Sequence, residues 1–193
     1  MGASRKAAAA AKPAKTQIRL SGFGGQGIIL AGQILGKAVT LFEGRNAVMT
    51  QSFGPEARGG ACSADVVLSD SRIHYPGVTA PDVLVVMSEE AARTYGPGAG
   101  EGSLVLVNEE LVRTVPQGPG LRVRSIPATR IAEGLGQVMA ANIVMLGFLA
   151  AESGAVGRDA LEKALLDTLP ARSHELNQKA FAAGYEYVGK LGG

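Results

Sequence analysis

The chain has 193 residues, 46% of them hydrophobic, and a formal net charge of +2 at pH 7. This length suits one well-packed α/β domain and is too short for two ordinary ones. A protein-only iron–sulfur or structural zinc site needs about four ligands. A single cysteine, Cys62, and two histidines cannot supply them, and one cysteine excludes an internal disulfide. We expect Cys62 to be a small core residue.

The positive charge is concentrated in the first residues. Residues 1–16 carry Arg5, Lys6, Lys12 and Lys15 and no acid, which leaves 15 basic and 17 acidic side chains for the rest. The rest is therefore mildly acidic, and no nucleic-acid-binding face is indicated. The Ala/Lys-rich composition of residues 1–16 predicts a disordered tail, although a basic, acid-free segment is also compatible with an organellar transit peptide. Residues 17–193 are expected to form the folded domain.

No apolar run approaches the roughly 20 residues that a membrane span requires. The longest, residues 138–151, has 14 residues and is interrupted by Asn142. The tail also lacks the apolar core of a secretory signal. We therefore expect a cytoplasmic protein without a membrane span.

Apolar patterning predicts an α/β domain that opens with a strand, a glycine turn and a helix. The continuous apolar runs 82–87 and 104–107 are typical of parallel strands that are covered on both faces. The result is a single domain with five or six mostly parallel strands, helices on both faces and an antiparallel excursion around residues 61–76. The expected strands are 17–21, 46–50, 66–68, 82–87, 104–107 and 121–126, with 72–75 as a hairpin partner of 66–68; the expected helices are 28–42, 89–95, 128–135, 138–152, 159–169 and 173–190.

The glycine turn has the spacing of a phosphate-binding motif. Gly22, Gly24 and Gly27 form G-x-G-x-x-G between a strand and a helix, where backbone N–H groups can face an anion. A dinucleotide site also needs an acid about twenty residues further on, at the end of the second strand. Glu43 has this spacing but precedes the second strand. The nicotinamide hypothesis therefore lacks its ribose ligand, and a turn used for packing or for another ligand stays open.

A second candidate site is the loop 51–60, which follows the second strand and so lies at the carboxyl edge of the sheet. Arg58 could bind a phosphate or carboxylate there, with Glu56 orienting the guanidinium and Gly59 and Gly60 leaving room for the ligand. The alternative is a local ion pair that only holds the loop.

Several other residues have simpler expected roles. The helix 138–151 is apolar nearly all round, so we expect it to be buried in the domain centre or against a partner. Gly32 and Gly36 lie on one face of helix 28–42 and would let it pack closely, and we expect a partner to cover some of the surface of these two helices. Asn142 is expected to be a satisfied core or interface group. His74 belongs to no motif, and His174 is expected to be solvated.

These motifs together resemble the γ subunits of 2-oxoacid:ferredoxin oxidoreductases, including the 2-oxoglutarate, ketoisovalerate and phenylglyoxylate enzymes, and the corresponding domain of pyruvate:ferredoxin oxidoreductase. The resemblance spans residues 17–190 and depends on the joint pattern, because each short motif alone is unspecific. It rests on 22–27 (GFGGQG), Gln51, Ser52, 54–60 (GPEARGG), 81–83 (PDV), 175–177 (ELN), Ala180 and Phe181.

The resemblance implies a subunit without a complete catalytic site. In such a complex, other subunits would hold thiamine diphosphate, Mg²⁺ and 4Fe–4S clusters, and coenzyme A would be a co-substrate. The resemblance implies α and β subunits as partners, with a δ or ferredoxin-like subunit as a further candidate. Ferredoxin or another acceptor would take up the electrons through the complex, and the sequence does not decide between ferredoxin and NAD. The residues implied to face the coenzyme A side are Gly24, Gly25, Gln26, Gly27, Ser52, Gly54, Glu56, Arg58, Gly59 and Gly60.

Two alternatives from other classes remain. One is a free-standing nicotinamide-dependent dehydrogenase, which the missing ribose acid disfavours. The other is a nucleotide-binding regulator. Which 2-oxoacid would be used cannot be inferred from the residues.

Overall fold

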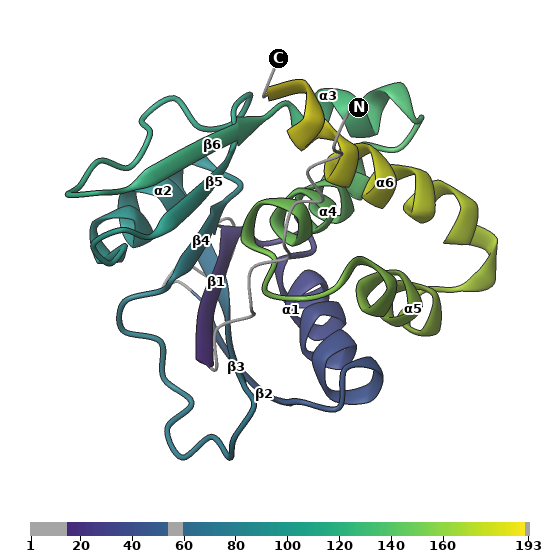
Figure 1. Cartoon of the computed structure of the whole chain (residues 1–193). Helices are drawn as coiled ribbons and strands as arrows, with labels where there is room; N and C mark the ends of the chain where they lie inside the picture. The colour runs from purple at the N-terminus through teal and green to yellow at the C-terminus, as the bar shows by residue number, and fades with distance from the viewer. Residues whose placement is uncertain (1–14, 54–59, 192–193) are drawn as a thin grey trace, which may run out of the picture.

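A computed structural model of the chain describes residues 15–53 and 60–191, and these form a six-stranded sheet with helices on both faces (Figure 1). The strands are β1 (Lys15–Phe23), β2 (Asn46–Phe53), β3 (Ala61–Ser69), β4 (Val83–Val86), β5 (Leu104–Asn108) and β6 (Arg122–Ile126). The helices are α1 (Ile28–Lys37), α2 (Glu89–Tyr95), α3 (Ala128–Gly134), α4 (Ala141–Ser153), α5 (Arg158–Thr168) and α6 (His174–Leu191), with a π-helical turn η1 (Ala38–Phe42) and short 3₁₀ turns η2 (Gly96–Gly98), η3 (Val138–Ala140) and η4 (Ala171–Ser173).

The strand order is β2-β3-β1-β4-β5-β6. Strands β1, β4, β5 and β6 pair in parallel, whereas β3 runs antiparallel to both β1 and β2. The expected α/β class, the mostly parallel sheet and the antiparallel excursion are therefore confirmed. In the dinucleotide-binding arrangement, the second strand lies directly beside the first. Here β3 separates β1 from β2, so the end of β2 cannot serve as the ribose site of the dehydrogenase alternative.

Two details of the strand prediction were wrong. Residues 72–75 form no strand, because β3 takes β1 and β2 as its partners instead of a following hairpin strand. The strands β2 and β3 are also longer than expected: β2 continues to Phe53, and β3 begins at Ala61.

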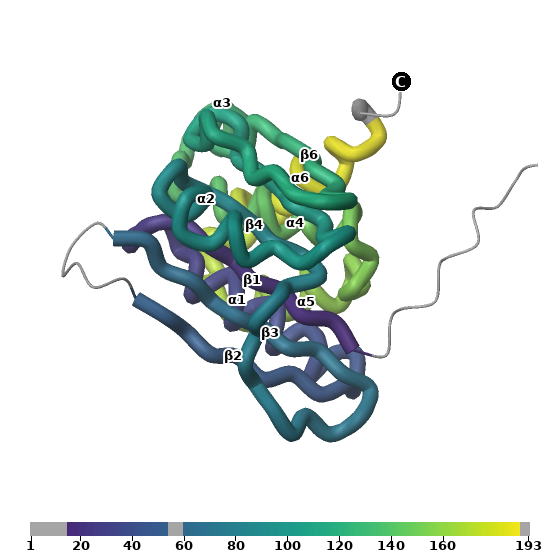
Figure 2. Tube along the Cα trace, turned by 90° about the vertical axis from the view of Figure 1, so that its left-hand side faces the viewer, coloured from purple at the N-terminus to yellow at the C-terminus, as the bar shows by residue number. Residues whose placement is uncertain are grey.

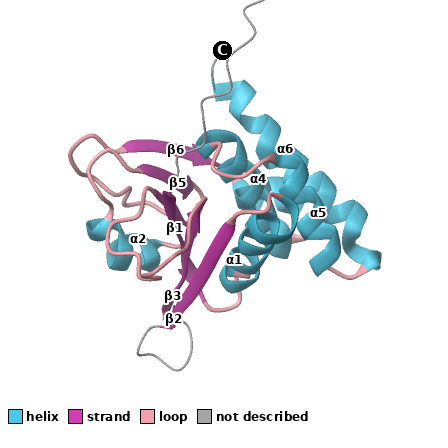
Figure 3. Cartoon of the chain, turned by 60° about the horizontal axis from the view of Figure 1, so that its bottom comes forward, coloured by secondary structure: helices cyan, strands magenta, loops and turns pink. Residues whose placement is uncertain are grey.

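The sheet separates two cores, as Figure 3 shows by placing α2 on one side and α1, α4, α5 and α6 on the other. Alternate side chains of β4 make the division clear, since Val83 and Val85 join the larger core while Leu84 and Val86 join the smaller one. Helices α1 and α2 thus leave the sheet on opposite faces. The boundary between their strands, β1 and β4, is the place where open α/β sheets bind ligands.

The apolar helix lies inside the chain's own core. All residues from Ala140 to Ala150 are buried, and α6 packs along α4. Of the two alternatives for this helix, burial in the domain centre is confirmed for these residues, and no partner is needed to cover them. Val138 and Met139 in η3 stay exposed in this chain. Of the two glycines expected to allow close packing of α1, only Gly32 does so. A Cβ at Gly32 would lie 2.7 Å from Ala64 Cβ, whereas a Cβ at Gly36 would meet no atom within 4 Å.

Within residues 15–53 and 60–191, no helix combines the length and the apolar character that a membrane crossing requires.

Candidate functional site

The glycine turn at the end of β1 is held by the side chain of Gln26. Its Oε1 accepts a hydrogen bond from the N–H of Phe23 (2.9 Å), and its Nε2 donates to the carbonyl oxygen of Met87 (2.9 Å), just beyond β4. A Cβ at Gly22 would collide with Gln26 Oε1. Gln26 therefore uses both side-chain atoms to join the ends of β1 and β4, and Gly22 provides the space for it.

The last glycine of the turn is fixed by helix α4. Gly27 has a left-handed φ of 73° and caps α1, and its carbonyl oxygen accepts a hydrogen bond from Asn142 Nδ2 (3.1 Å). A Cβ at Gly27 would collide with this amide. Asn142 is thus satisfied, as expected. The fold alone accounts for glycine at positions 22 and 27.

Gly24 and Gly25 differ from these two residues. Both are exposed, and a Cβ at either would meet no atom within 4 Å. Gly25 has a φ of 99°, which favours glycine, but Gly24 has an ordinary φ. Neither packing nor backbone conformation therefore requires a glycine at position 24, and the backbone there is open to a ligand.

The second candidate loop begins and ends at the same sheet edge as the glycine turn (Figure 2). The ladder between β1 and β3 ends at the pair Phe23 and Ala61, so Gly24 and Gly60 are the first residues beyond it on the two strands. Ser52 pairs with Ser63 on β3. Two strand spacings of about 4.8 Å therefore separate Ser52 from β1. Gly54, Glu56, Arg58 and Gly59 lie outside the described residues.

A cavity of about 360 Å³ opens beside the glycine turn, at the carboxyl ends of β1, β4 and β5. Its rim carries unusually exposed apolar side chains, with exposed fractions of 40% for Phe23, 38% for Leu111, 49% for Val138 and 59% for Met139. The other lining residues are Gly25, Gln26, Met87, Asn108, Thr129 and Ala141. An apolar cavity at the switch point of an α/β sheet is a typical ligand or partner site.

Asn108 is the polar residue of this cavity that sequence reasoning missed. It is fully buried, and its Nδ2 donates to Thr129 Oγ1 (2.9 Å) while its Oδ1 has no hydrogen-bond partner. A buried amide oxygen without a donor is costly. The available signal was an amide residue directly after the apolar run 104–107.

A smaller hollow of about 240 Å³ lies on the other side of the turn, between α1, η3 and α6. It is lined by Gly27, Asn142 and Asn177 among others, and it shares Met139 with the first cavity. Asn177 donates from Nδ2 to the carbonyl oxygen of Ser173 (2.8 Å). Part of the 175–177 motif therefore lies close to the glycine turn, although it is far away in the sequence.

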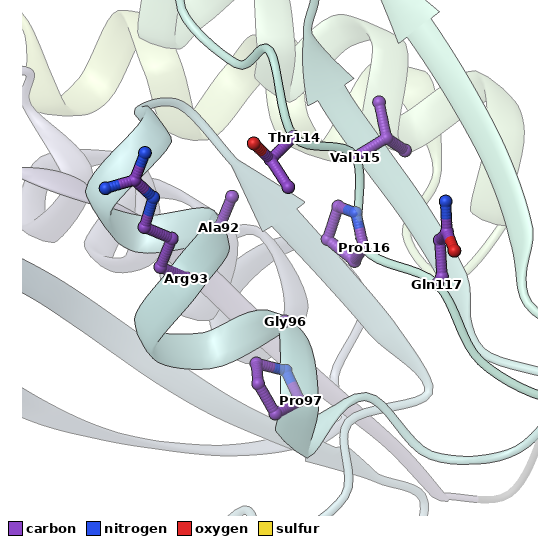
Figure 4. A pocket seen from close by; sticks show the side chains of 8 residues that line it. All are labelled: Ala92, Arg93, Gly96, Pro97, Thr114, Val115, Pro116 and Gln117. Carbon is purple, nitrogen blue, oxygen red and sulfur yellow. The ribbon is translucent and has the colours of Figure 1, made fainter.

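A third cavity, of about 450 Å³, lies on the opposite sheet face, between α2 with η2 and the loop that leads to β6 (Figure 4). Figure 4 shows Arg93 and Pro97 on one side and Thr114, Val115 and Gln117 on the other. The loop is held by Glu89, whose carboxylate accepts hydrogen bonds from the backbone N–H groups of Arg113 (2.7 Å) and Thr114 (3.0 Å).

Hydrogen bonds from Thr114 and then from Arg113 lower the pKa of Glu89 to about 2, so the carboxylate stays ionised even at acidic pH values where an ordinary glutamate is protonated. No residue expected to form the site lines the third cavity. We therefore regard it as a product of loop packing.

Cys62 and His174 make contacts within the fold and do not line the cavity beside the glycine turn. Cys62 is buried as expected, and this burial raises the pKa of its thiol. His174 is partly exposed, so the expectation of a solvated side chain holds only in part: its Nε2 also lies 2.7 Å from the carbonyl oxygen of Leu169. Among the described residues, no group of three or more His, Cys, Asp or Glu side chains could hold a metal ion.

Comparisons with known proteins agree with this architecture. Residues 17–187 match the family described as pyruvate ferredoxin/flavodoxin oxidoreductase. The chain is 48% identical to the 2-oxoglutarate synthase subunit KorC of Methanocaldococcus jannaschii, over 92% of this chain and 96% of that protein. It is 32% identical to the ketoisovalerate oxidoreductase subunit VorA of Methanothermobacter thermautotrophicus, over 90% of this chain but only 36% of that protein.

A solved structure provides the third comparison. The crystal structure of the keto/oxoacid ferredoxin oxidoreductase γ subunit from Geobacter sulfurreducens superposes with a TM-score of 0.82 at 39% identity, covering 91% of this chain and 99% of that one. Sequence and fold agree over nearly the whole length. The chain belongs to the pyruvate ferredoxin/flavodoxin oxidoreductase family, and within it to the γ-type subunits of 2-oxoacid:ferredoxin oxidoreductases.

Proposed function

We propose that this chain is the γ subunit of a complex that oxidatively decarboxylates 2-oxoglutarate to its coenzyme A thioester and passes the electrons to ferredoxin. The observation that carries the choice of oxoacid is the identity of 48% to a 2-oxoglutarate synthase subunit, over almost all of both chains, against 32% to a ketoisovalerate oxidoreductase subunit. The proposal places the complex in the cytoplasm, with thiamine diphosphate, Mg²⁺ and 4Fe–4S clusters in α, β and δ-type subunits.

The apolar rim supports an assembled state. Phe23, Leu111, Val138 and Met139 surround one cavity at the sheet edge, and such a patch on a subunit is a typical interaction surface. In the ketoisovalerate relative, the matching region is 36% of a longer chain, which is consistent with a domain that works in contact with its neighbours. We place the α and β subunits at this edge.

The function is tested by purifying the native protein without an affinity tag, together with any subunits that stay bound to it. We expect thiamine- and iron–sulfur-containing subunits to co-purify, and ferredoxin reduction to require coenzyme A and to be fastest with 2-oxoglutarate among 2-oxoglutarate, pyruvate and ketoisovalerate. A chain that purifies alone contradicts the proposal. A complex that prefers another oxoacid contradicts only the choice of substrate.

We further propose that the glycine turn and Arg58 serve the coenzyme A side of the active site. The open backbone at Gly24 and Gly25 supports this, because main-chain N–H groups can then approach a phosphate or an amide. The same role is assigned to Gln26, Gly27, Ser52, Gly54, Glu56, Gly59 and Gly60, of which Gln26 and Gly27 act by holding the turn. Arg58 would pair with a phosphate of coenzyme A through two parallel hydrogen bonds.

The variant Arg58→Ala is expected to raise the KM for coenzyme A about ten- to a hundredfold, because a hydrogen bond to a charged group contributes about 1.5–3 kcal/mol. The KM for the oxoacid and the binding of thiamine should stay nearly unchanged. Arg58→Lys keeps the charge but loses the paired geometry, and should give an intermediate KM. If Arg58 instead clasps Glu56 or another subunit, all constants should deteriorate together and the complex should loosen on size exclusion.

A further inference from the structure

A concave basic site lies at the opposite edge of the sheet, where β1 begins and β3 ends. Its volume is about 310 Å³, and its lining residues are Lys15, Ser69, Ser71, Arg72, Ile73, His74 and Tyr75. At about 3.3 Å per residue, the nine residues of β1 place this site roughly 25 Å from the glycine turn. It is therefore separate from the coenzyme A side.

The charge of this site is unbalanced. Lys15, Arg72 and His74 line it together, and the lining contains no carboxylate. Among the ion pairs of the described residues, neither Lys15 nor Arg72 takes part, and the neighbouring acid Asp70 pairs with Arg45 (2.6 Å). Because the chain beyond residue 16 has more acids than bases, a pocket with two unneutralised cations stands out from its surroundings.

The walls of the site are held in place by local contacts. The N–H of Ser71 donates to Ser69 Oγ (3.1 Å), and Ser69 is buried, which fixes the turn that leads into Arg72. The ring of Tyr75 lies over Gly77, where a Cβ would come within 2.6 Å of the ring. Tyr75 is nevertheless 65% exposed. One side of the Tyr75 ring therefore lies against the backbone of Gly77, and the rest of the ring is accessible to a ligand.

We propose that this pocket binds a phosphate dianion carried by a small molecule. Lys15 and Arg72 supply the charge, since a guanidinium pairs a phosphate through two parallel hydrogen bonds. The ring N–H of His74 and the hydroxyl of Ser71 supply further donors. The volume of about 310 Å³ is at the lower end of small-molecule sites and suits a mononucleotide or a sugar phosphate. A nucleoside base could stack on Tyr75.

The test is calorimetric titration of the purified complex, saturated with coenzyme A, with inorganic pyrophosphate at constant ionic strength. We expect saturable binding, weakened about ten- to a hundredfold by Arg72→Gln and by Lys15→Gln, because each removes a charged hydrogen bond. Arg122→Gln is the matched control. It removes the same charge from an exposed position at the start of β6, and should leave the affinity unchanged.

Two further arms separate this pocket from general charge attraction. Deleting residues 2–12 removes Arg5, Lys6 and Lys12, and should leave pyrophosphate binding intact. Titration with adenosine monophosphate and with ribose 5-phosphate identifies the source of the phosphate, because tighter binding of adenosine monophosphate indicates a nucleotide and equal binding of the two indicates a sugar phosphate.

Equal weakening by Arg122→Gln, loss of binding on tail deletion, or unchanged affinity in both pocket variants would overturn the proposal. All arms measure affinity instead of turnover. The outcome is therefore independent of which oxoacid the complex uses.

Discussion

Replacing Gly184 in α6 by alanine is expected to destabilise the fold by about 3 kcal/mol or more. A Cβ at Gly184 would collide with the carbonyl oxygen of Val144 in α4 and lie 3.1 Å from the N atom of Phe148. These are backbone atoms, so no side-chain rotation can relieve the overlap, and the two helices must separate. Phe148 and Phe181 are fully buried in the same contact and would lose packing. Gly147 on α4 faces the backbone of α6 in the same way, so Gly147→Ala should have a similar effect.

The matched control is Gly36→Ala in α1, where a Cβ would meet no atom within 4 Å. Alanine is the better helix former, so this variant should gain about 0.5–1 kcal/mol. Thermal unfolding of the full chain measures both effects. For a domain of this size, each kcal/mol shifts Tm by about 2–4 °C, which predicts a fall of about 6–12 °C for Gly184→Ala. Equal Tm values for Gly184→Ala and Gly36→Ala would show that the helices are not in backbone contact.

The larger elements of the fold could be predicted because their signals are local. The runs 82–87 and 104–107 are continuous and apolar, and the structure places β4 and β5 there, buried on both faces. Helix α2 was predicted with its observed bounds, Glu89–Tyr95. These elements are set by burial within a few residues of the chain.

The arrangement of β2 and β3 depends on distant partners and was not fully predictable. The ends of β2 and β3 contain small or polar residues such as Ser52 and Ser63, which resemble a loop when seen alone. They become strands because they pair with each other and because β3 also pairs with β1. Sequence reasoning instead gave β3 a local partner at 72–75. Those residues line the basic pocket.

The candidate site shows the same division. The glycine turn was found from its spacing, but the separate roles of its glycines require the structure, since Gln26 and Asn142 approach Gly22 and Gly27 from positions that the pattern does not specify. Asn108 and the apolar rim around Met139 could not be assembled from sequence, because they come from segments that meet only in the folded chain.

The glycines of the turn allow stability and ligand binding to be separated. Gly27→Ala is expected to lower stability by about 3 kcal/mol. An L side chain at a φ of 73° costs about 1–2 kcal/mol, and the displaced amide of Asn142 loses its hydrogen bond and stays buried, which costs a further 1–3 kcal/mol. Gly25→Ala is the matched control. It has the strained φ of 99° but no neighbour within 4 Å, so only the first cost of about 1–2 kcal/mol should appear.

Gly24→Ala should have the opposite profile. The φ is ordinary and the space is open, so stability should be unchanged or rise by up to about 1 kcal/mol. If coenzyme A approaches this backbone, the new Cβ obstructs it, and the KM for coenzyme A in the assembled complex should rise about tenfold, equivalent to ~1.4 kcal/mol. The KM for the oxoacid should not change. Thermal unfolding and steady-state kinetics of the three variants test the prediction together. A Gly24→Ala complex with parental stability and an unaltered KM for coenzyme A would exclude the turn from the coenzyme A side, and would leave Gln26 and Asn142 as purely structural supports of the sheet edge.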